Sequence, residues 1–136
     1  MTKAMLIVLF FTSLVIYTSA GPVPKEFEDV APEIRKICLA ESGTTNEMVN
    51  EVGLGKFTED DKLKCYLRCL FDQFRLMTPK GLNFKGFLAL SPPNMKEKAV
   101  VMVEKCKETT GKDLCELSFN LHKCFYEAFP DVSSQN

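Results

Sequence analysis

Residues 58–77 read TEDDKLKCYLRCLFDQFRLM, and this stretch decides the fold class. Its apolar residues recur at intervals of three and four, which is the spacing of one face of an α-helix. These residues are Leu63, Leu67, Leu70, Phe74 and Met77. Thr58 is the expected N-cap, with acidic residues in the first turn, and Cys65 and Cys69 fall roughly on the opposite side of the helix. We therefore expect a central helix that is packed through one face and covalently tied through the other.

The C-terminal part of the chain repeats this design. Asp113 and Glu116 have the spacing of a capping box, and Pro130 ends the helical pattern that follows them. The apolar stripe of this helix is Leu114, Leu117, Leu121, Phe125 and Ala128. Cys115 and Cys124 face opposite sides of such a helix, so they cannot bond to each other and must reach different neighbours.

Two helices are expected before the central one. Residues 27–37 carry apolar side chains at helical spacing, and Pro32 is expected to start the regular part of this helix or to kink it. Thr44 begins a small capping box ahead of a second, short helix, which Gly53 closes.

Two more helices are expected between the central helix and the last one. Residues 83–90 form a short helix that Gly86 weakens. Pro92 opens a longer helix, which Gly111 ends. The expected buried face of this longer helix is Ala99, Met102, Val103 and Cys106. With about six helices, short loops and almost no strand signal, the sequence predicts an all-α fold in one domain.

The first twenty residues have the pattern of a signal peptide. Lys3 precedes an apolar run of about 14 residues, and small residues follow at positions 18–20. A membrane anchor needs roughly 20 apolar residues. We therefore expect residues 1–20 to be removed and residues 21–136 to form a secreted, extracellular domain without stable membrane insertion.

The composition excludes several classes of function. With 17 basic and 18 acidic residues, the chain has no basic surplus with which to bind nucleic acid. A single histidine and the lack of a CxxC pair argue against a zinc site, and no metal or other cofactor is expected. We also expect no enzymatic activity, because His122 has no evident catalytic partner and the cysteines are expected to be oxidised.

Six cysteines in a small secreted chain predict a disulfide framework. A bond between Cys65 and Cys69, one helical turn apart, is strained, and a bond between Cys115 and Cys124 is excluded by geometry. These two exclusions leave ten of the 15 possible pairings. The spacing alone does not choose among them.

The intervals between consecutive cysteines are 26, 3, 36, 8 and 8 residues. Together with the leader and the helical pattern, these intervals resemble those of the six-cysteine odorant-binding proteins of insects, the pheromone/general odorant-binding family. The interval of 3 and the final interval of 8 are diagnostic, and the resemblance covers essentially the whole chain after residue 20. It implies the disulfides Cys38–Cys69, Cys65–Cys115 and Cys106–Cys124.

The resemblance also implies a function. It describes a compact helical shell around an apolar cavity, which carries odorants, pheromones or similar lipid-like molecules through extracellular fluid to receptors. The implied partners are a small hydrophobic ligand and an odorant receptor, and the implied state is a monomer or weak homodimer. Two alternatives stay open: a carrier with a non-olfactory role in another secreted fluid, and a secreted helical signalling protein.

The resemblance places the ligand pocket at residues near the cysteines, and helical stripes extend this set. Phe125 is the first candidate, followed by Val103 and Phe74. The segment after Cys124 is expected to close the mouth of the pocket with Phe129 and Val132. The complete expected wall is Leu67, Leu70, Phe71, Phe74, Phe87, Leu88, Val100, Val103, Leu121, Phe125 and Phe129.

The polar contact to a ligand is not assigned by the sequence. Tyr66 and Tyr126 are candidates, but neither clearly faces the interior on a helical wheel. His122 lies three residues from Phe119 and from Phe125, and histidine titrates near physiological pH. A pH-sensing role for His122 is therefore open, although a packed or exposed structural histidine is the more common case.

Overall fold

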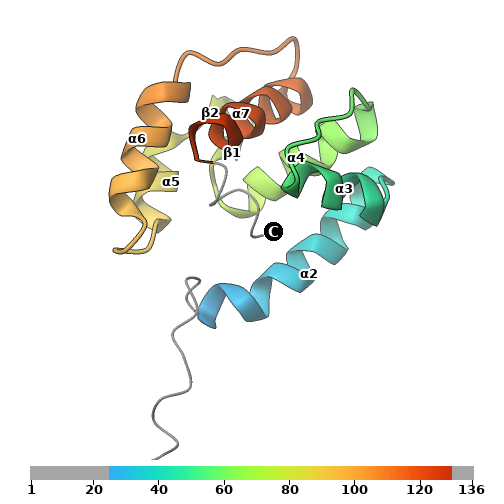
Figure 1. Cartoon of the computed structure of the whole chain (residues 1–136), viewed down its shortest axis with the longest axis horizontal. Coiled ribbons are helices and arrows are strands. Elements are labelled where there is room, and N and C mark those ends of the chain that lie inside the picture. The colour runs from blue at the N-terminus through green and yellow to red at the C-terminus, as the bar shows by residue number, and fades with distance from the viewer. Residues whose placement is uncertain (1–24, 130–136) are drawn as a thin grey trace, which may run out of the picture.

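The structure, a computed structural model, describes residues 25–129 and contains six helices and one small hairpin in that range (Figure 1). The helices are α2 (Lys25–Ser42), α3 (Asn46–Gly53), α4 (Asp61–Gln73), α5 (Phe84–Leu90), α6 (Lys96–Cys106) and α7 (Leu114–Ala128). The all-α prediction is confirmed. The expected signal peptide, residues 1–20, and the expected mouth residue Val132 lie outside the described residues.

The hairpin between α4 and α5 was not predicted. Its strands β1 (Met77–Thr78) and β2 (Gly81–Leu82) pair antiparallel, with Met77 opposite Leu82. Two residues are too few to show the alternating pattern of a strand. Gly81 has a φ of +113°, a left-handed conformation that glycine adopts without strain and that lets the chain turn back.

Helix α4 is the central element, because both α2 and α7 pack against it (Figure 1). Its N-cap is Asp60 rather than the expected Thr58, and the Asp60 carboxylate accepts a hydrogen bond of 2.9 Å from the amide of Leu63. A carboxylate is the stronger cap, because it also interacts favourably with the positive end of the helix dipole. The helix therefore begins two residues later than the capping-box pattern indicated.

The central helix also ends earlier than expected. Arg75 has a left-handed φ of 57°, and the amide of Leu76 donates a hydrogen bond of 2.9 Å to the carbonyl of Phe71. This closure is of the Schellman type, which stops an α-helix and redirects the chain. Met77 was expected on the helical stripe; it belongs instead to β1, where it is still buried.

Caps of other helices match the sequence more closely. Asp113 caps α7 as expected, and its carboxylate accepts a hydrogen bond of 2.8 Å from the amide of Glu116. At α3 the cap is Thr45, one residue after the expected Thr44, because its hydroxyl accepts the hydrogen bond from Met48.

Two helices have bounds that differ from the prediction. Helix α2 begins at Lys25, so Pro32 lies well inside it and does not start its regular part. Helix α6 begins at Lys96 and ends at Cys106, which makes it shorter than the predicted stretch after Pro92. A separate turn before α6 is closed by a hydrogen bond of 2.9 Å from the amide of Met95 to the carbonyl of Pro92. The predicted buried face of α6 is confirmed in full.

The core consists of two apolar clusters. The first cluster is Ile34, Cys38, Val49, Val52, Leu63, Tyr66, Leu67, Cys69 and Phe119. The second cluster is Phe71, Leu76, Met77, Met102, Cys106, Leu121 and Phe125. Helices α4 and α7 contribute to both clusters, so these two helices join one half of the core to the other.

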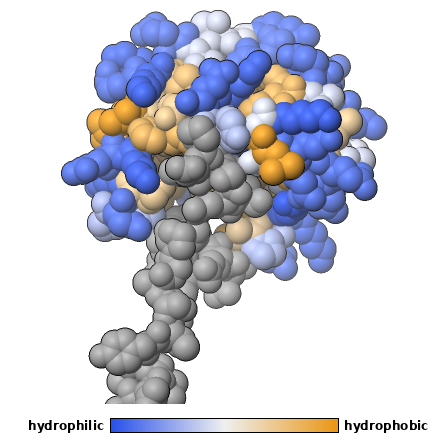
Figure 2. All heavy atoms as spheres, in the orientation of Figure 1, coloured by the Kyte–Doolittle hydropathy of each residue, from blue (hydrophilic) through white to orange (hydrophobic). Residues whose placement is uncertain are grey.

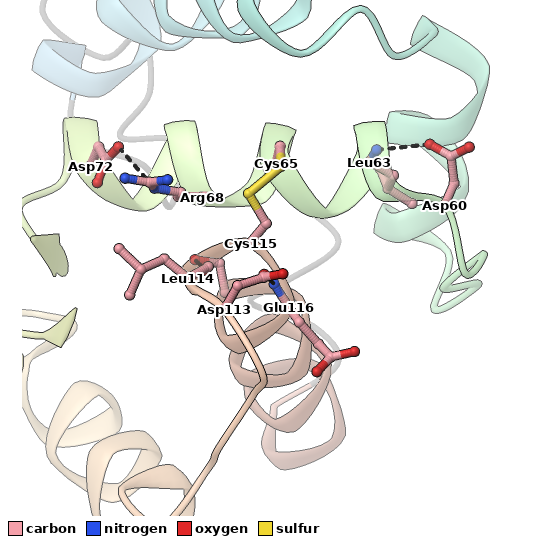
Figure 3. The surroundings of a disulfide bond; sticks show 10 residues. Asp60, Leu63, Cys65, Arg68, Asp72, Asp113, Leu114, Cys115 and Glu116 are labelled. Atoms are coloured by element: carbon pink, nitrogen blue, oxygen red, sulfur yellow. Dashed lines mark hydrogen bonds and ion pairs between the residues drawn. A yellow bond between two sulfur atoms is a disulfide. The ribbon is translucent and has the colours of Figure 1, made fainter. Parts of the chain in front are cut away.

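Three disulfides link the helices. Cys38–Cys69 joins α2 to α4, and Cys65–Cys115 joins α4 to the start of α7 (Figure 3). Cys106–Cys124 joins α6 to α7. These are the three pairs that the resemblance to the insect proteins implies.

The surface is largely polar. The face drawn in Figure 2 is mostly hydrophilic, and its apolar residues form small separate groups. Among residues 25–129 no helix has the length and apolar character to cross a membrane.

Candidate ligand-binding site

The predicted pocket residues divide between the two clusters. Leu67 belongs to the first cluster, and the half-buried Leu70 and Phe74 pack against it. The second cluster contains three of the predicted residues, and two more pack against it as half-buried side chains. These five are Phe71, Leu121, Phe125, Phe87 and Phe129. The predicted wall therefore spans the boundary between the clusters rather than surrounding one of them.

Three predicted residues lie outside both clusters. Val103 is buried on α6, and Leu88 is half-buried on α5. Val100 is 45% exposed, because the buried face of α6 centres on Ala99 and Cys106 and each residue along a helix turns by roughly 100°. The structure does not bring Val100 to the other wall residues.

A series of aromatic rings connects the clusters. Phe57, which packs against the first cluster, lies 5.8 Å from the ring of His122, and His122 lies 5.8 Å from Phe71. Phe71 in turn contacts Phe125 at 6.2 Å, and Phe125 stacks on Phe87 at 5.9 Å. The spacing of these rings is that of favourable aromatic pairs. The contacting rings therefore run without a break from the first cluster to α5.

His122 is the polar member of this series. It is 6% exposed, and its Nε2 atom has no hydrogen-bond partner within residues 25–129. Burial lowers the pKa of His122 from its usual 6.5 to about 4, so the imidazole is neutral at pH 7. The structure therefore has a buried histidine, and not an exposed one that titrates near physiological pH.

A small cavity of about 10 Å³ lies beside His122. Its lining is Val49, Val52, Gly53, Tyr66, Leu67, Leu70 and His122. This volume holds about one water-sized group. The sequence did not indicate the cavity, because its lining comes from α3, α4 and α7 and forms only when the three helices pack together.

A larger hollow of about 280 Å³ lies beside the Cys65–Cys115 disulfide. Its lining is Glu41, Ser42, Cys65, Arg68, Cys69, Asp72 and Cys115. Figure 3 shows Arg68 and Asp72 side by side on α4, with Nε and Oδ2 3.9 Å apart. Partial burial raises the pKa of the Asp72 carboxyl. A charged hollow of this kind does not suit an apolar ligand.

Phe57 is a member of the ring series that the sequence pattern does not indicate. It precedes α4 in a loop, so no helical stripe identifies it. In the structure its ring lies 5.7 Å from Phe119 and 5.9 Å from Tyr126, as well as next to His122.

Comparison with known proteins identifies the family. The model of the PBP/GOBP family matches residues 21–128. This chain belongs to the PBP/GOBP family. The family prediction drawn from the cysteine intervals is confirmed.

Individual odorant-binding proteins resemble the chain over most of its length. General odorant-binding protein 72 of Anopheles gambiae is 28% identical over 112 residues, which are 78% of this chain and 93% of that protein. General odorant-binding protein 19d of Drosophila melanogaster is 30% identical and covers 81% of this chain and 79% of its own length.

The fold also matches solved members of the family. Odorant Binding Protein 7 of Anopheles gambiae has a TM-score of 0.74 at 25% identity, with 82% of this chain and 92% of that chain covered. That protein has four disulfide bridges and was solved in complex with an azo compound. The described part of the present chain has three such bridges.

Proposed function

We propose that this protein is an extracellular carrier, which binds small hydrophobic molecules at the boundary between its two apolar clusters and delivers them to receptors. The observation that carries the proposal is the family match over residues 21–128. Odorant Binding Protein 7, a relative of the same fold, binds an azo compound. The leader pattern in residues 1–20 supports secretion.

The packing at the rim of the second cluster supports ligand entry there. Helix α5 contains no buried residue, and Phe84, Phe87 and Phe129 are only partly buried against the second cluster. Partly buried side chains of this kind separate at a lower cost in free energy than fully buried ones. The rim of the second cluster is therefore the part of the core that can open around an apolar guest.

The residues at the boundary suit a neutral apolar ligand. Leu67, Phe71 and Phe125 are buried and carry no polar side-chain atom. A ligand that buries its surface against such residues gains free energy in proportion to the apolar area removed from water. We expect micromolar affinity, which corresponds to about −8 kcal/mol.

A displacement titration tests the proposal. The protein without residues 1–20 is loaded with the apolar fluorophore N-phenyl-1-naphthylamine and titrated with a panel of volatile and lipid-like compounds. We expect displacement by several members at micromolar concentration. Lack of displacement by every member of a broad panel would overturn the carrier proposal.

A pair of variants locates the site in the same assay. Phe125→Leu removes an aromatic ring from the boundary, and Leu54→Ala changes a side chain that is 80% exposed. We expect weaker fluorophore binding in the first variant and unchanged binding in the second. The opposite pattern would place the site away from the boundary.

A further inference from the structure

The structure leaves one buried polar atom unexplained. Nε2 of His122 lies inside the protein without a hydrogen-bond partner in the described range. Buried polar groups nearly always have a partner, because an unpaired group loses its hydrogen bonds to water and gains nothing in return. Nε of Arg68 also lacks a hydrogen bond, but Arg68 is partly exposed and lies beside the Asp72 carboxylate. An additional polar group that paired with Nε2 of His122 would therefore stabilise the protein.

The space beside His122 matches one small polar group. The cavity of about 10 Å³ is too small for a whole ligand and large enough for a single oxygen atom with its hydrogen. Most of its lining is apolar, including Val52, Leu67 and Leu70. An oxygen placed there would lie beside His122, the residue with the unpaired Nε2 atom, and would have apolar surface around it.

A series of packed rings leads away from this cavity. The ring of His122 contacts Phe71, which contacts Phe125, which stacks on Phe87. A ligand chain attached to the oxygen would separate these rings and lie against them, from the first cluster to the rim of the second. The polar end and the apolar chain would therefore contact one series of neighbouring residues.

The charges around this cavity determine which polar group of a ligand would fit there. The residues that line this cavity include no charged side chain. Lys64, the one buried ammonium within residues 30–129, lies 2.7 Å from Glu59 and 3.6 Å from Glu116, so it is already paired. A carboxylate at His122 would be a buried charge without a partner, which is strongly unfavourable, whereas a neutral oxygen needs only a hydrogen bond.

We propose that His122 is the polar contact of the binding site, and that its Nε2 atom pairs with the oxygen of a neutral long-chain ligand, an alcohol or a carbonyl compound rather than a fatty acid anion. This proposal rests on the carrier function proposed above. The low pKa of His122 supports it, because a neutral imidazole offers one donor and one acceptor and so matches a hydroxyl group in either tautomer.

Binding of three matched probes tests the proposal. Dodecan-1-ol, dodecanal and dodecanoate compete with N-phenyl-1-naphthylamine at pH 7.5, with the wild-type protein and with His122→Phe. We expect the wild type to bind dodecan-1-ol about tenfold more tightly than dodecanoate. Relative to its affinity for the fluorophore, His122→Phe loses about tenfold in affinity for the alcohol, the size of one hydrogen bond. Tighter binding of dodecanoate, or equal alcohol affinity in both proteins, overturns the proposal.

Tyr66→Phe is the matched comparison. It removes the other polar side chain that lines the cavity and keeps the aromatic ring. We expect it to lose less affinity for dodecan-1-ol than His122→Phe loses. A tenfold loss in Tyr66→Phe with no loss in His122→Phe would assign the polar contact to Tyr66 instead.

NMR spectroscopy tests the proposal on the wild-type protein alone. The chain has a single histidine, so the imidazole nitrogen signals of the uniformly ¹⁵N-labelled protein belong to His122 alone. We expect saturating dodecan-1-ol to shift the Nε2 signal, and an unchanged signal at saturation overturns the proposal. If the wild type binds none of the probes and no fluorophore, the carrier function itself fails. If the probes bind but the Nε2 signal of His122 does not shift, the carrier function stands and His122 is not the polar contact.

Discussion

The two apolar clusters share α4 and α7 but differ in the elements that cover them. Each has a fully buried centre, which is Leu63 and Phe119 in the first cluster and Leu76 and Leu121 in the second. The second cluster has a rim of partly buried aromatic residues, among them Phe84 and Phe87 from a helix without a single buried residue. Tight packing gives stability and a unique arrangement, whereas partly buried contacts open at low free energy. We infer that the first cluster maintains the fold and that the rim of the second cluster rearranges when a ligand binds.

The largest expected effect is a loss of protein stability when the first cluster is disrupted. Phe119 is 1% exposed, and its ring packs edge-on against Phe57. We expect Phe119→Ala to lower the free energy of unfolding by about 3–5 kcal/mol, because it leaves a cavity in a region with little room to relax. Urea unfolding measures this loss. Phe87→Ala is the comparison, and a loss as large as that of Phe119→Ala would mean that both clusters are equally tightly packed.

The next largest effect is the dependence of the free energy of unfolding on pH through His122. The pKa of His122 is about 4 in the folded protein and about 6.5 in an unfolded chain. Between these values the unfolded chain binds a proton that the folded protein does not, so acid favours unfolding. The histidine is expected to remove about 3 kcal/mol of stability as the pH falls from 7 to 4.

His122→Phe isolates this contribution from that of the carboxylates. Urea unfolding of both proteins is measured from pH 4 to 8, and the difference in stability between them should change along this range. The wild type should lose relative stability below about pH 6.5. Two curves that stay parallel would show that the histidine is not buried in its neutral form.

A smaller effect is expected for ligand binding at the rim. Phe87 stacks on Phe125 and is only partly buried. We expect Phe87→Ala to weaken binding of N-phenyl-1-naphthylamine by about tenfold, because part of an aromatic surface no longer covers the ligand. Val101→Ala, on the exposed side of α6, is the control and should leave the affinity unchanged. If Phe87→Ala also binds as the wild type does, the rim does not contact the ligand.

The smallest effect concerns the start of α4, which serves both clusters. Asp60 accepts the capping hydrogen bond from Leu63. We expect Asp60→Ala to lower the free energy of unfolding by about 1 kcal/mol, as is usual for the loss of an N-cap. Thr58→Ala should change stability by less than about 0.5 kcal/mol. A larger loss in Thr58→Ala would restore Thr58 as the cap.

Local sequence patterns predicted the features that depend on one helix. The buried face of α6 and the Asp113 cap follow from spacing within a few residues, and both are present. The end of α4 did not follow, because the left-handed Arg75 and the hairpin after it form where the chain turns back onto the core. Residues 58–61 contain several possible N-caps for α4. The sequence pattern alone did not distinguish Thr58 from Asp60.

The candidate site was harder to predict, because it also forms only when separate parts of the chain pack together. The resemblance supplied pocket residues on helices, but Phe57 lies in a loop and the cavity beside His122 has walls from three helices. The burial of His122 lowers its pKa, and burial is a property of the packed molecule rather than of its neighbours in the sequence. Sequence spacing identified the residue but not its unpaired nitrogen.

The disulfides have a consequence for the kinetics of ligand exchange. They connect four helices in the order α2, α4, α7 and α6, and α5 lies in the 36-residue segment between Cys69 and Cys106 without a cysteine of its own. Helix α5 can therefore leave and rejoin the second cluster while the linked helices keep their positions. Amide hydrogens of α5 should exchange with solvent sooner than those of α4. The residence time of a ligand would then be set by the opening of one short helix, and the protein could load and unload its guest many times without unfolding.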